Sequence, residues 1–271
     1  MKWLMSRNKA WKTPFPLPAD TAETAMADGG RCENFGLLLD RYVGYNAAKG
    51  GLQLIREFSD RQALVPDFQQ QKEMLHAVAQ RWRARADSLG AVTFTARPQW
   101  RVIVGLSNNV VLEAGITADP VFGVPVIPGS ALKGISRGYA QRVLGEPLDH
   151  LDVQFGWQAE EQGGCGDLVF LTGVPVTPPR IERDVINPIF SEYYRGQQPP
   201  GSYLSPAPFF FLTVGKASYY QFGVASLTGD QEAAQEGARW LQEALRIMGT
   251  GAKTAAGYGA WVVEPVPRTE Q

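Results

Sequence analysis

The chain has 271 residues, of which 44% are hydrophobic and 20% charged, and its formal net charge is −1. That length can bury a substantial core, in one large domain or two small ones. The near-neutral charge argues against a free-standing, strongly basic nucleic-acid binder, so nucleic-acid contacts have to come from local clusters of cations.

Neither a membrane span nor an export signal is expected. No apolar run approaches the roughly 18 residues that a spanning helix needs, and the basic N-terminus lacks a following apolar stretch. The two cysteines, Cys32 and Cys165, lie far apart and form no C-x-x-C pair. We therefore expect free thiols in a reducing cytoplasm, and neither a zinc site nor another metal site.

The first ninety residues predict a helical N-terminal extension that packs on the rest of the chain. Residues 1–19 are basic and rich in proline, which is typical of an extended, solvated end. Residues 67–89 predict an amphipathic helix, because apolar side chains recur at spacings of three and four. These side chains are Leu75, Val78, Trp82, Ala86 and Leu89. We expect the arginines on its polar face to be solvated and not to contact RNA.

Residues 91–271 predict a second unit in which strands alternate with helices. Strands are expected at 91–104, 167–171, 209–214, 218–225 and 257–263, and helices at 130–144 and 230–248. The strands at 209–214 and 218–225 suggest a hairpin around Gly215 and Lys216. The segment at about 174–208 is too irregular for a core element and predicts an insertion.

The resulting order, βαββαβ, predicts an α+β protein with a ferredoxin-like, or RRM-like, core. RNA-recognition modules share this arrangement and read single strands on the open face of the sheet. Because the fold hosts many chemistries, the function has to be argued from the sites.

The first candidate site is the start of the helix at 130–144. Pro128 and Gly129 make a sharp turn, and Ser130 is a suitable N-cap. Ser130, Lys133 and Arg137 share one flank, opposite a predicted buried stripe. That stripe consists of Leu132, Ile135, Tyr139 and Val143. Two cations beside the positive end of a helix are suited to binding a phosphate. The alternative interpretation is a capped helix whose two cations are only solvated.

The second candidate site is the glycine-rich loop at 249–259. Glycines allow positive φ and close approach of backbone N–H groups to a ligand, and a neighbouring lysine favours an anion. The candidate residues are Gly249, Gly251, Lys253, Thr254 and Tyr258. The pattern fails as a Walker A or Rossmann motif, because the glycines are misplaced and the loop leads from a helix into a strand. A flexible surface loop is the plain alternative.

Two further groups carry weaker signals. Arg180 and Arg183, near Asp184, suggest a nucleic-acid path, an interface or a salt-bridged loop. His76 and His150 are the only histidines, and neither belongs to a catalytic or metal-binding motif. We therefore expect no catalytic residues and no cofactor.

Together these segments resemble the RAMP superfamily of CRISPR effector proteins. The resemblance rests on residues 126–137 and on the loop at 249–259. More narrowly, residues 184–194 and 206–214 resemble the sixth-subunit family of the type III-B Cmr effector complex. Ile189 departs from that family, which has a histidine after the preceding Asn-Pro pair.

The resemblance implies a non-catalytic backbone subunit of a ribonucleoprotein in antiviral defence. Such a subunit holds the 3′ part of the CRISPR RNA, meets complementary target RNA, and contacts a backbone RAMP, a small helical subunit and a tip RAMP. Lys133, Arg137 and the loop at 249–259 match the RNA-backbone-binding elements, and residues 174–208 match a thumb-like insertion.

Two other functions stay open at this point. One is a stand-alone RAMP-type endoribonuclease that processes CRISPR RNA, for which the two histidines are poor candidates. The other is a protein-interaction scaffold that never touches RNA, with Tyr193, Tyr194 and Tyr203 as interface anchors.

Overall fold

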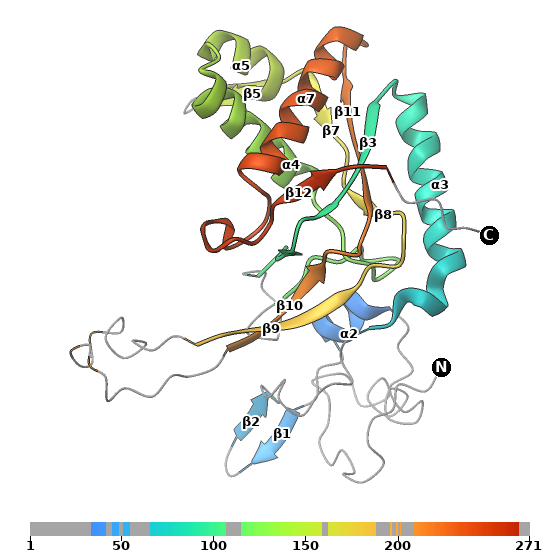
Figure 1. Cartoon of the computed structure of the whole chain (residues 1–271), viewed down its shortest axis with the longest axis vertical. Helices are drawn as coiled ribbons and strands as arrows, with labels where there is room; N and C mark the ends of the chain where they lie inside the picture. The colour runs from blue at the N-terminus through green and yellow to red at the C-terminus, as the bar shows by residue number, and fades with distance from the viewer. Residues whose placement is uncertain are drawn as a thin grey trace.

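Helices and antiparallel strands combine in an α+β architecture in the computed structural model (Figure 1). The structure describes residues 34–41, 45–48, 51–54, 66–106, 115–158, 162–187, 196, 199, 201 and 209–265. Several predictions fall outside these residues, namely those on residues 1–19, on Ile189 and on the three tyrosines Tyr193, Tyr194 and Tyr203. Within the described residues, no helix combines the length and apolarity that a membrane span demands.

The central sheet has four main strands in the order β12-β3-β11-β7, and neighbouring strands are antiparallel. Their bounds are Val92–Pro98 for β3, Leu168–Phe170 for β7, Tyr220–Ser226 for β11 and Trp261–Val263 for β12. A two-residue strand, β8 (Val174–Pro175), also pairs with the start of β11. In the register of β3 and β11, Phe94 lies opposite Phe222, and their rings stack at 5.5 Å.

Two helices cover one face of this sheet, α4 (Gly129–Tyr139) and α7 (Gln231–Ile247) (Figure 1). Asp230 caps α7 by accepting hydrogen bonds from the N–H groups of Glu232 and Ala233. Gly237 allows α7 to approach the sheet closely, since a Cβ there would lie 2.8 Å from Leu168 Cδ1. The resulting core contains Tyr220, Phe222 and Trp261, which are almost fully buried.

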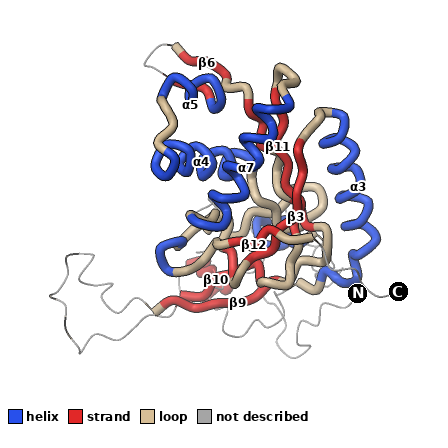
Figure 2. The backbone as a smooth tube through the Cα atoms, turned by 45° about the horizontal axis from the view of Figure 1, so that its top comes forward, coloured by secondary structure: helices blue, strands red, loops and turns tan. Residues whose placement is uncertain are grey.

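The opposite face of the sheet is covered by α3 (Lys72–Ser88), on the far side of the strands from α7 (Figures 1 and 2). Trp82 is buried and its Nε1 donates to Thr172 O at 2.8 Å, and Gln221 Nε2 donates to Ala79 O at 3.0 Å. A Cβ on Gly223 would lie 3.1 Å from Trp82 Cη2, so the helix sits directly on β11. RNA-recognition modules bind single strands on an open sheet face, but here α3 covers that face of the central sheet.

A second, three-stranded sheet has the order β4-β10-β9. It consists of β4 (Arg101–Val102), β9 (Ile181–Ile186) and β10 (Phe209–Gly215). Two predictions are wrong here. β9 is a regular strand inside the segment expected to be irregular, and β10 pairs with β9 and β4 instead of forming a hairpin with β11. A short turn alone does not fix which strand becomes a partner.

Smaller elements complete the described part of the chain. They are α2 (Phe35–Arg41), β1 (Tyr45–Ala48), β2 (Gly51–Leu54), η3 (Phe68–Gln71), η4 (Ala140–Leu144), α5 (Leu148–Phe155), β5 (Gly156–Gln158), β6 (Gly163–Cys165) and η5 (Thr254–Ala256). The strands β1 and β2 pair with each other, as do β5 and β6.

The predicted helix stripes hold over most of their length and fail at the ends. Leu132 and Tyr139 are buried as expected, but Val143 is 51% exposed because η4 is a π-helical turn that changes the helical period. Leu89 follows the last residue of α3 and is 47% exposed. Pro128, and not Ser130, is the N-cap of α4, and no side-chain capping hydrogen bond is formed there within the described residues.

Candidate nucleic-acid interface

The glycine-rich loop, residues 249–259, is held firmly at its base. Gly249 ends α7 with φ at 71°, and its N–H donates to Ala244 O at 2.9 Å. The N–H of Thr250 donates to Gly259 O at 2.8 Å and closes the loop. The N–H groups of Ala252 and Gly259 donate to the carbonyls of Ile103 and Arg101, both at 2.8 Å. The loop is thus fixed by its backbone to the β4 segment, and the flexible-loop alternative does not describe its base.

Two of the glycines are required by this close packing of backbone on backbone. A Cβ on Gly251 would lie 2.1 Å from Ile103 O, and a Cβ on Gly259 would lie 2.2 Å from Thr250 O. Gly257 differs, because no described residue has an atom within 4 Å of the position of a Cβ there. The high glycine content is therefore required by the close backbone packing at the loop base, whereas the described residues leave free space around the tip.

The exposed tip of the loop is the part that suits an anion. Lys253 is exposed, and its φ of 59° lies in the left-handed region, which is strained for a residue with a Cβ. It is followed by the short 3₁₀ turn η5. Among the described residues, no backbone carbonyl accepts a hydrogen bond from the N–H of Lys253, Thr254 or Ala255. Successive N–H groups beside an ammonium are a suitable environment for a phosphate oxygen.

Tyr258 fixes the loop to the second sheet. Its hydroxyl donates to Asp184 Oδ2 at 2.8 Å, and Arg101 Nη1 lies 2.7 Å from the same oxygen. Arg101 Nε also donates to Glu182 Oε2 at 2.8 Å, so one guanidinium bridges two carboxylates of β9. We call these four residues, Arg101, Glu182, Asp184 and Tyr258, the anchor cluster.

The anchor cluster shifts the pKa values of its members. Burial by itself would raise the pKa of Asp184, but hydrogen bonds from Tyr258, the Val185 N–H and Arg101 outweigh it and lower this pKa. Burial, followed by the hydrogen bond to Asp184, raises the pKa of Tyr258 to about 12. At neutral pH, Asp184 is therefore ionised and Tyr258 keeps its proton, which is the arrangement that the hydrogen bond requires.

Trp100, which sequence reasoning did not single out, lies beside this cluster. Its side chain is 45% exposed, its ring centroid is 4.9 Å from that of Tyr258, and the Arg101 guanidinium carbon is 5.1 Å from the ring. The sequence signal that could have found it is a Trp-Arg pair at the break between two strand-forming runs. Exposed aromatics next to arginine are common in single-stranded nucleic-acid sites.

The flank of α4 is only partly available. Ser130 is exposed and Lys133 is partly exposed, and no ion pair of Lys133 is found among the described residues. Arg137 is engaged, because its Nη1 donates to Gly156 O at 2.6 Å and its Nη2 lies 3.0 Å from Asp152 Oδ1. Arg137 thereby ties α4 to α5 and β5, a role that the sequence did not suggest.

The two arginines of the β9 region are placed differently. Arg180 is largely exposed and its Nε lies 3.3 Å from Glu182 Oε1, so it extends the anchor cluster. Arg183 is partly buried within β9, opposite Leu212 of β10. The structure thus joins Asp184 to Tyr258, which is 74 residues further along the chain, and places Arg180 beside them through Glu182.

The α4 flank and the loop are less closely connected. In the described part of the chain, no hydrogen bond or ion pair joins Ser130, Lys133 or Arg137 to residues 249–259. The end of α4 does approach Met248, the residue before the loop, because a Cβ on Gly138 would lie 3.3 Å from Met248 Cε. Lys133 lies five residues before Gly138, a rise of about 7.5 Å along the helix axis.

His150, on α5, packs against α7. His150 Nε2 lies 3.4 Å from Glu236 Oε2 of α7, and its ring lies 5.7 Å from that of Trp240. Among the residues that the structure describes, no group of three or more histidine, cysteine, aspartate or glutamate side chains is arranged to hold a metal ion.

Comparisons with known proteins give a consistent result. No protein-family model matches the sequence. The chain is 30% identical over 240 residues to the CRISPR system Cmr subunit Cmr6 of Pyrococcus furiosus, covering 65% of this chain and 69% of that protein. It is 28% identical over 136 residues to the Cmr6 subunit of Saccharolobus solfataricus, covering 48% of this chain and 44% of the other.

Among solved structures, the fold matches a chain in the cryo-EM structure of the type III-B Cmr-beta complex bound to cognate target RNA. The TM-score is 0.58 at 21% sequence identity, over 75% of this chain and 68% of that one. At this level of identity the match supports the fold alone.

Proposed function

Because the chain belongs to the Cmr6 family of CRISPR subunits, we propose that it is an RNA-binding, non-catalytic subunit of a type III-B effector complex. Its partners are the CRISPR RNA, complementary target RNA and the other Cmr subunits. The observation that carries this proposal is the 30% identity to a Cmr6 protein over 69% of that protein's length. The fold match to a chain of a target-bound Cmr complex agrees with it.

We assign the central sheet to the ferredoxin-like fold. Support comes from the chain order β3-α4-β7-β11-α7-β12 and from the sheet order β12-β3-β11-β7. These orders correspond to a split βαβ unit with a second strand–helix pair. With α3 on one sheet face and α4 and α7 on the other, RNA contacts fall on the loops and helix flanks at the rim of the sheet.

We propose two kinds of residue at this rim. The first kind contacts the RNA backbone, and all of its members are exposed or partly exposed. They are Lys253, Thr254, Lys133, Ser130 and Arg180. The second kind holds those contacts in place. Gly249 and Gly251 act through the loop base, and Tyr258 acts through the anchor cluster. Arg137 acts through the link between α4 and α5, and Arg183 through β9. Phosphate contacts of this kind position RNA without reading its sequence, which suits a subunit that has to accept any guide.

The test is purification of the chain, tagged, with its native Cmr partners, followed by sequencing of the bound RNA. We expect short RNAs that carry CRISPR repeat sequence, together with other Cmr subunits. A chain that purifies without RNA and without those subunits would contradict the proposal.

An endoribonuclease is the second candidate, and no observation favours it. The His150 imidazole contacts Glu236 and Trp240 of α7, and among the described residues no ion pair joins it to the loop at 249–259. The same purified chain, incubated with repeat RNA, is expected to leave it intact. If the unmodified chain cleaves repeat RNA and His150→Ala does not, the endoribonuclease would become the preferred function.

A further inference from the structure

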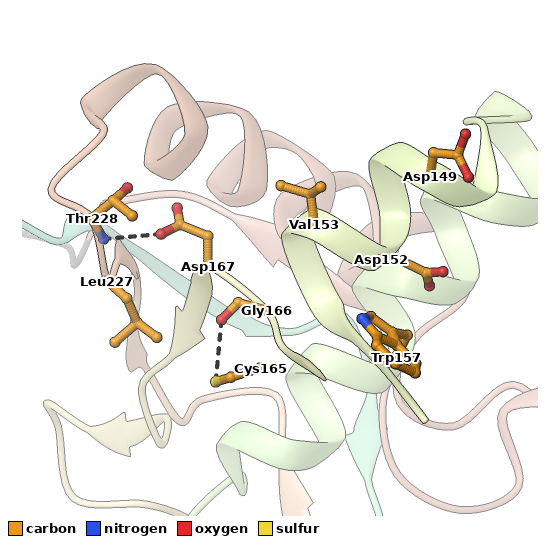
Figure 3. Close-up of a pocket in the computed structure, with 9 residues that line it drawn as sticks. All are labelled: Asp149, Asp152, Val153, Trp157, Cys165, Gly166, Asp167, Leu227 and Thr228. Atoms are coloured by element: carbon orange, nitrogen blue, oxygen red, sulfur yellow. Dashed lines mark hydrogen bonds between the residues drawn. The ribbon is translucent and has the colours of Figure 1, made fainter. Parts of the chain in front are cut away.

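One hollow in the described part of the chain is lined by none of the residues that we propose to contact RNA. It has a volume of about 790 Å³ and lies between α5, the β5–β6 hairpin and the segment after β11 (Figure 3). We call it the α5 pocket. The side chains that decide its chemistry are Asp149, Asp152, Val153, Trp157, Asp167 and Leu227.

The apolar side chains of the α5 pocket are unusually exposed for their type. Val153 is 65% exposed, Leu227 62% and Trp157 43%. Leu148, at the start of α5, adds another exposed apolar side chain at 60%. Single exposed apolar residues are common on protein surfaces, but several around one hollow mark an interaction site.

The polar side chains of the α5 pocket carry negative charge. Among the described residues that line it are three aspartates and no lysine, arginine or histidine. Asp149 is exposed, and Asp152 is partly neutralised by Arg137, which approaches at 3.0 Å. Asp167 accepts a hydrogen bond from the N–H of Thr228 at 2.9 Å, which is the contact drawn beside it in Figure 3.

Asp167 keeps its charge at neutral pH. Burial would raise its pKa, but hydrogen bonds from Ser226 and from Thr228 outweigh burial and lower it. A phosphate backbone would therefore be repelled here, whereas a cationic side chain would be attracted. The charge of the lining favours a protein partner over RNA.

We propose that the α5 pocket is a docking site for a basic segment of a neighbouring subunit, in which a lysine or arginine is flanked by apolar side chains. The cation is attracted by the aspartates of the lining, and the apolar neighbours cover Val153, Trp157 and Leu227. The proposal rests on the proposed function, since it requires that the chain works within a complex. It adds the surface that is used and the chemistry of the partner.

The first test places a photo-crosslinking amino acid, p-benzoylphenylalanine, at position 153 of the chain in the assembled complex. Val153 is largely exposed, so the replacement leaves the fold intact. The matched control is position 121, where Val121 is 72% exposed and does not belong to the pocket lining. We expect position 153, and not 121, to crosslink to a lysine- or arginine-bearing peptide of another subunit.

Three outcomes of that experiment would overturn the proposal. They are crosslinks from position 153 to RNA, crosslinks only to other residues of this same chain, such as its basic residues 1–12, and identical products from positions 153 and 121.

A pair of variants then tests the charge. Val153→Lys places a like charge against a basic partner, whereas Val153→Glu keeps the acidic character of the pocket. We expect Val153→Lys to reduce recovery of the crosslinked subunit at least about tenfold relative to Val153→Glu, as repulsion across an interface does. Val121→Lys is the control and should recover that subunit normally. Equal recovery with both pocket variants would contradict a basic partner.

Guide RNA is measured in the same samples to separate the two proposals. Loss of one subunit with guide RNA retained is the expected result for Val153→Lys, and it supports both proposals. Normal recovery of every subunit with Val153→Lys refutes the docking site while the proposed function stands. Absence of guide RNA from the unmodified complex refutes the proposed function.

Discussion

Lys253 shows how a single residue at the loop tip combines strain with exposure. Among the described residues that are not glycine, it is the one with a positive φ, at 59°. Such a conformation costs about 1–2 kcal/mol for a residue with a Cβ. The strain persists because the loop base is tied to Arg101 and Ile103 on one side and Tyr258 is tied to Asp184 on the other. A charge held at such a position points to function more than to stability.

Replacement of Lys253 separates these two effects. Lys253→Gly should stabilise the chain by about 1 kcal/mol in urea unfolding, because glycine adopts positive φ without strain. The same change should weaken RNA retention by the complex and reduce the slope of log K against log salt by about 0.7, the value for one phosphate contact on a single strand. Lys216→Ala, in the exposed turn after β10, is the charge-matched control and should leave the slope unchanged. An equal slope for both variants would remove Lys253 from the RNA contacts.

The charge of Asp184 makes a prediction about acid stability. The pKa of Asp184 is lower in the folded chain than the usual value of about 3.9. Its stabilising contribution is therefore complete above that value and is lost as the pH falls through the lower, folded pKa. Asp184→Asn should cost about 1–3 kcal/mol at pH 7, and this difference from the unmodified chain should shrink below about pH 4.

Urea titrations between pH 7 and pH 2.5 measure this effect. Asp87→Asn is the control, since the Asp87 side chain is 61% exposed and forms only a helix-surface pair with Arg83. Asp87→Asn should have little effect at any of these pH values. A cost for Asp184→Asn that persists unchanged at pH 2.5 would mean that the ionised carboxylate is not what the anchor cluster needs.

At the scale of elements, the sequence was informative where the signal is local. The helix predicted at 230–248 is observed as α7, Gln231–Ile247, because capping and periodicity depend on neighbouring residues. β9 was missed, since Ile181–Ile186 places charges on both faces and does not alternate. The partners of β10 were also missed, because they are Arg101–Val102 and β9 and not the adjacent β11. Likewise, the engagement of Arg137 depends on Asp152 and Gly156, whose positions only the tertiary structure sets.

Two glycines of one loop provide a matched test of its seating. Gly251 and Gly257 both have a φ of 92°. A Cβ would be 2.1 Å from Ile103 O at the first position and would have no atom of a described residue within 4 Å at the second. Gly257→Ala should therefore cost only the strain of positive φ, about 1–2 kcal/mol. Gly251→Ala should cost more than that and lift the loop from β4, which lowers RNA retention as well.

Thermal unfolding and guide-RNA retention, measured on both variants, check this prediction. If Gly251→Ala and Gly257→Ala behave alike, the loop does not need its close approach to the Ile103 carbonyl. If Gly251→Ala destabilises the chain but retains RNA normally, the loop is structural and its tip is not a phosphate contact.

At the scale of the whole molecule, charge sets the strength of RNA binding. The formal net charge of −1 supplies no long-range attraction for a polyanion. The anchor cluster adds no free cation either, because Arg101 is paired with both Glu182 and Asp184. Binding therefore depends on a few tip contacts, repeated and extended by neighbouring subunits along one RNA.

The isolated chain should accordingly bind CRISPR RNA only weakly. We expect a Kd weaker than about 1 μM at physiological salt, in the range of sequence-independent phosphate binding, while the assembled complex retains its RNA through purification. Fluorescence anisotropy with a labelled guide measures the first value, and RNA recovery from the complex measures the second. Nanomolar binding by the isolated chain would show that the assembly is not needed for affinity.

The seat of α3 on β11 has a consequence for synthesis of the chain. The two elements are joined by a hydrogen bond between Gln221 and Ala79, which are 142 residues apart. Likewise, β3 cannot pair until its partner strands β11 and β12 have been synthesised. At roughly 5–20 residues per second, a ribosome needs about 7–30 s to make the intervening segment. During that interval Trp82 and the apolar side of the nascent helix have no sheet to cover them. This subunit therefore has a long window in which chaperones, or an early-arriving partner, can bind it before its fold closes.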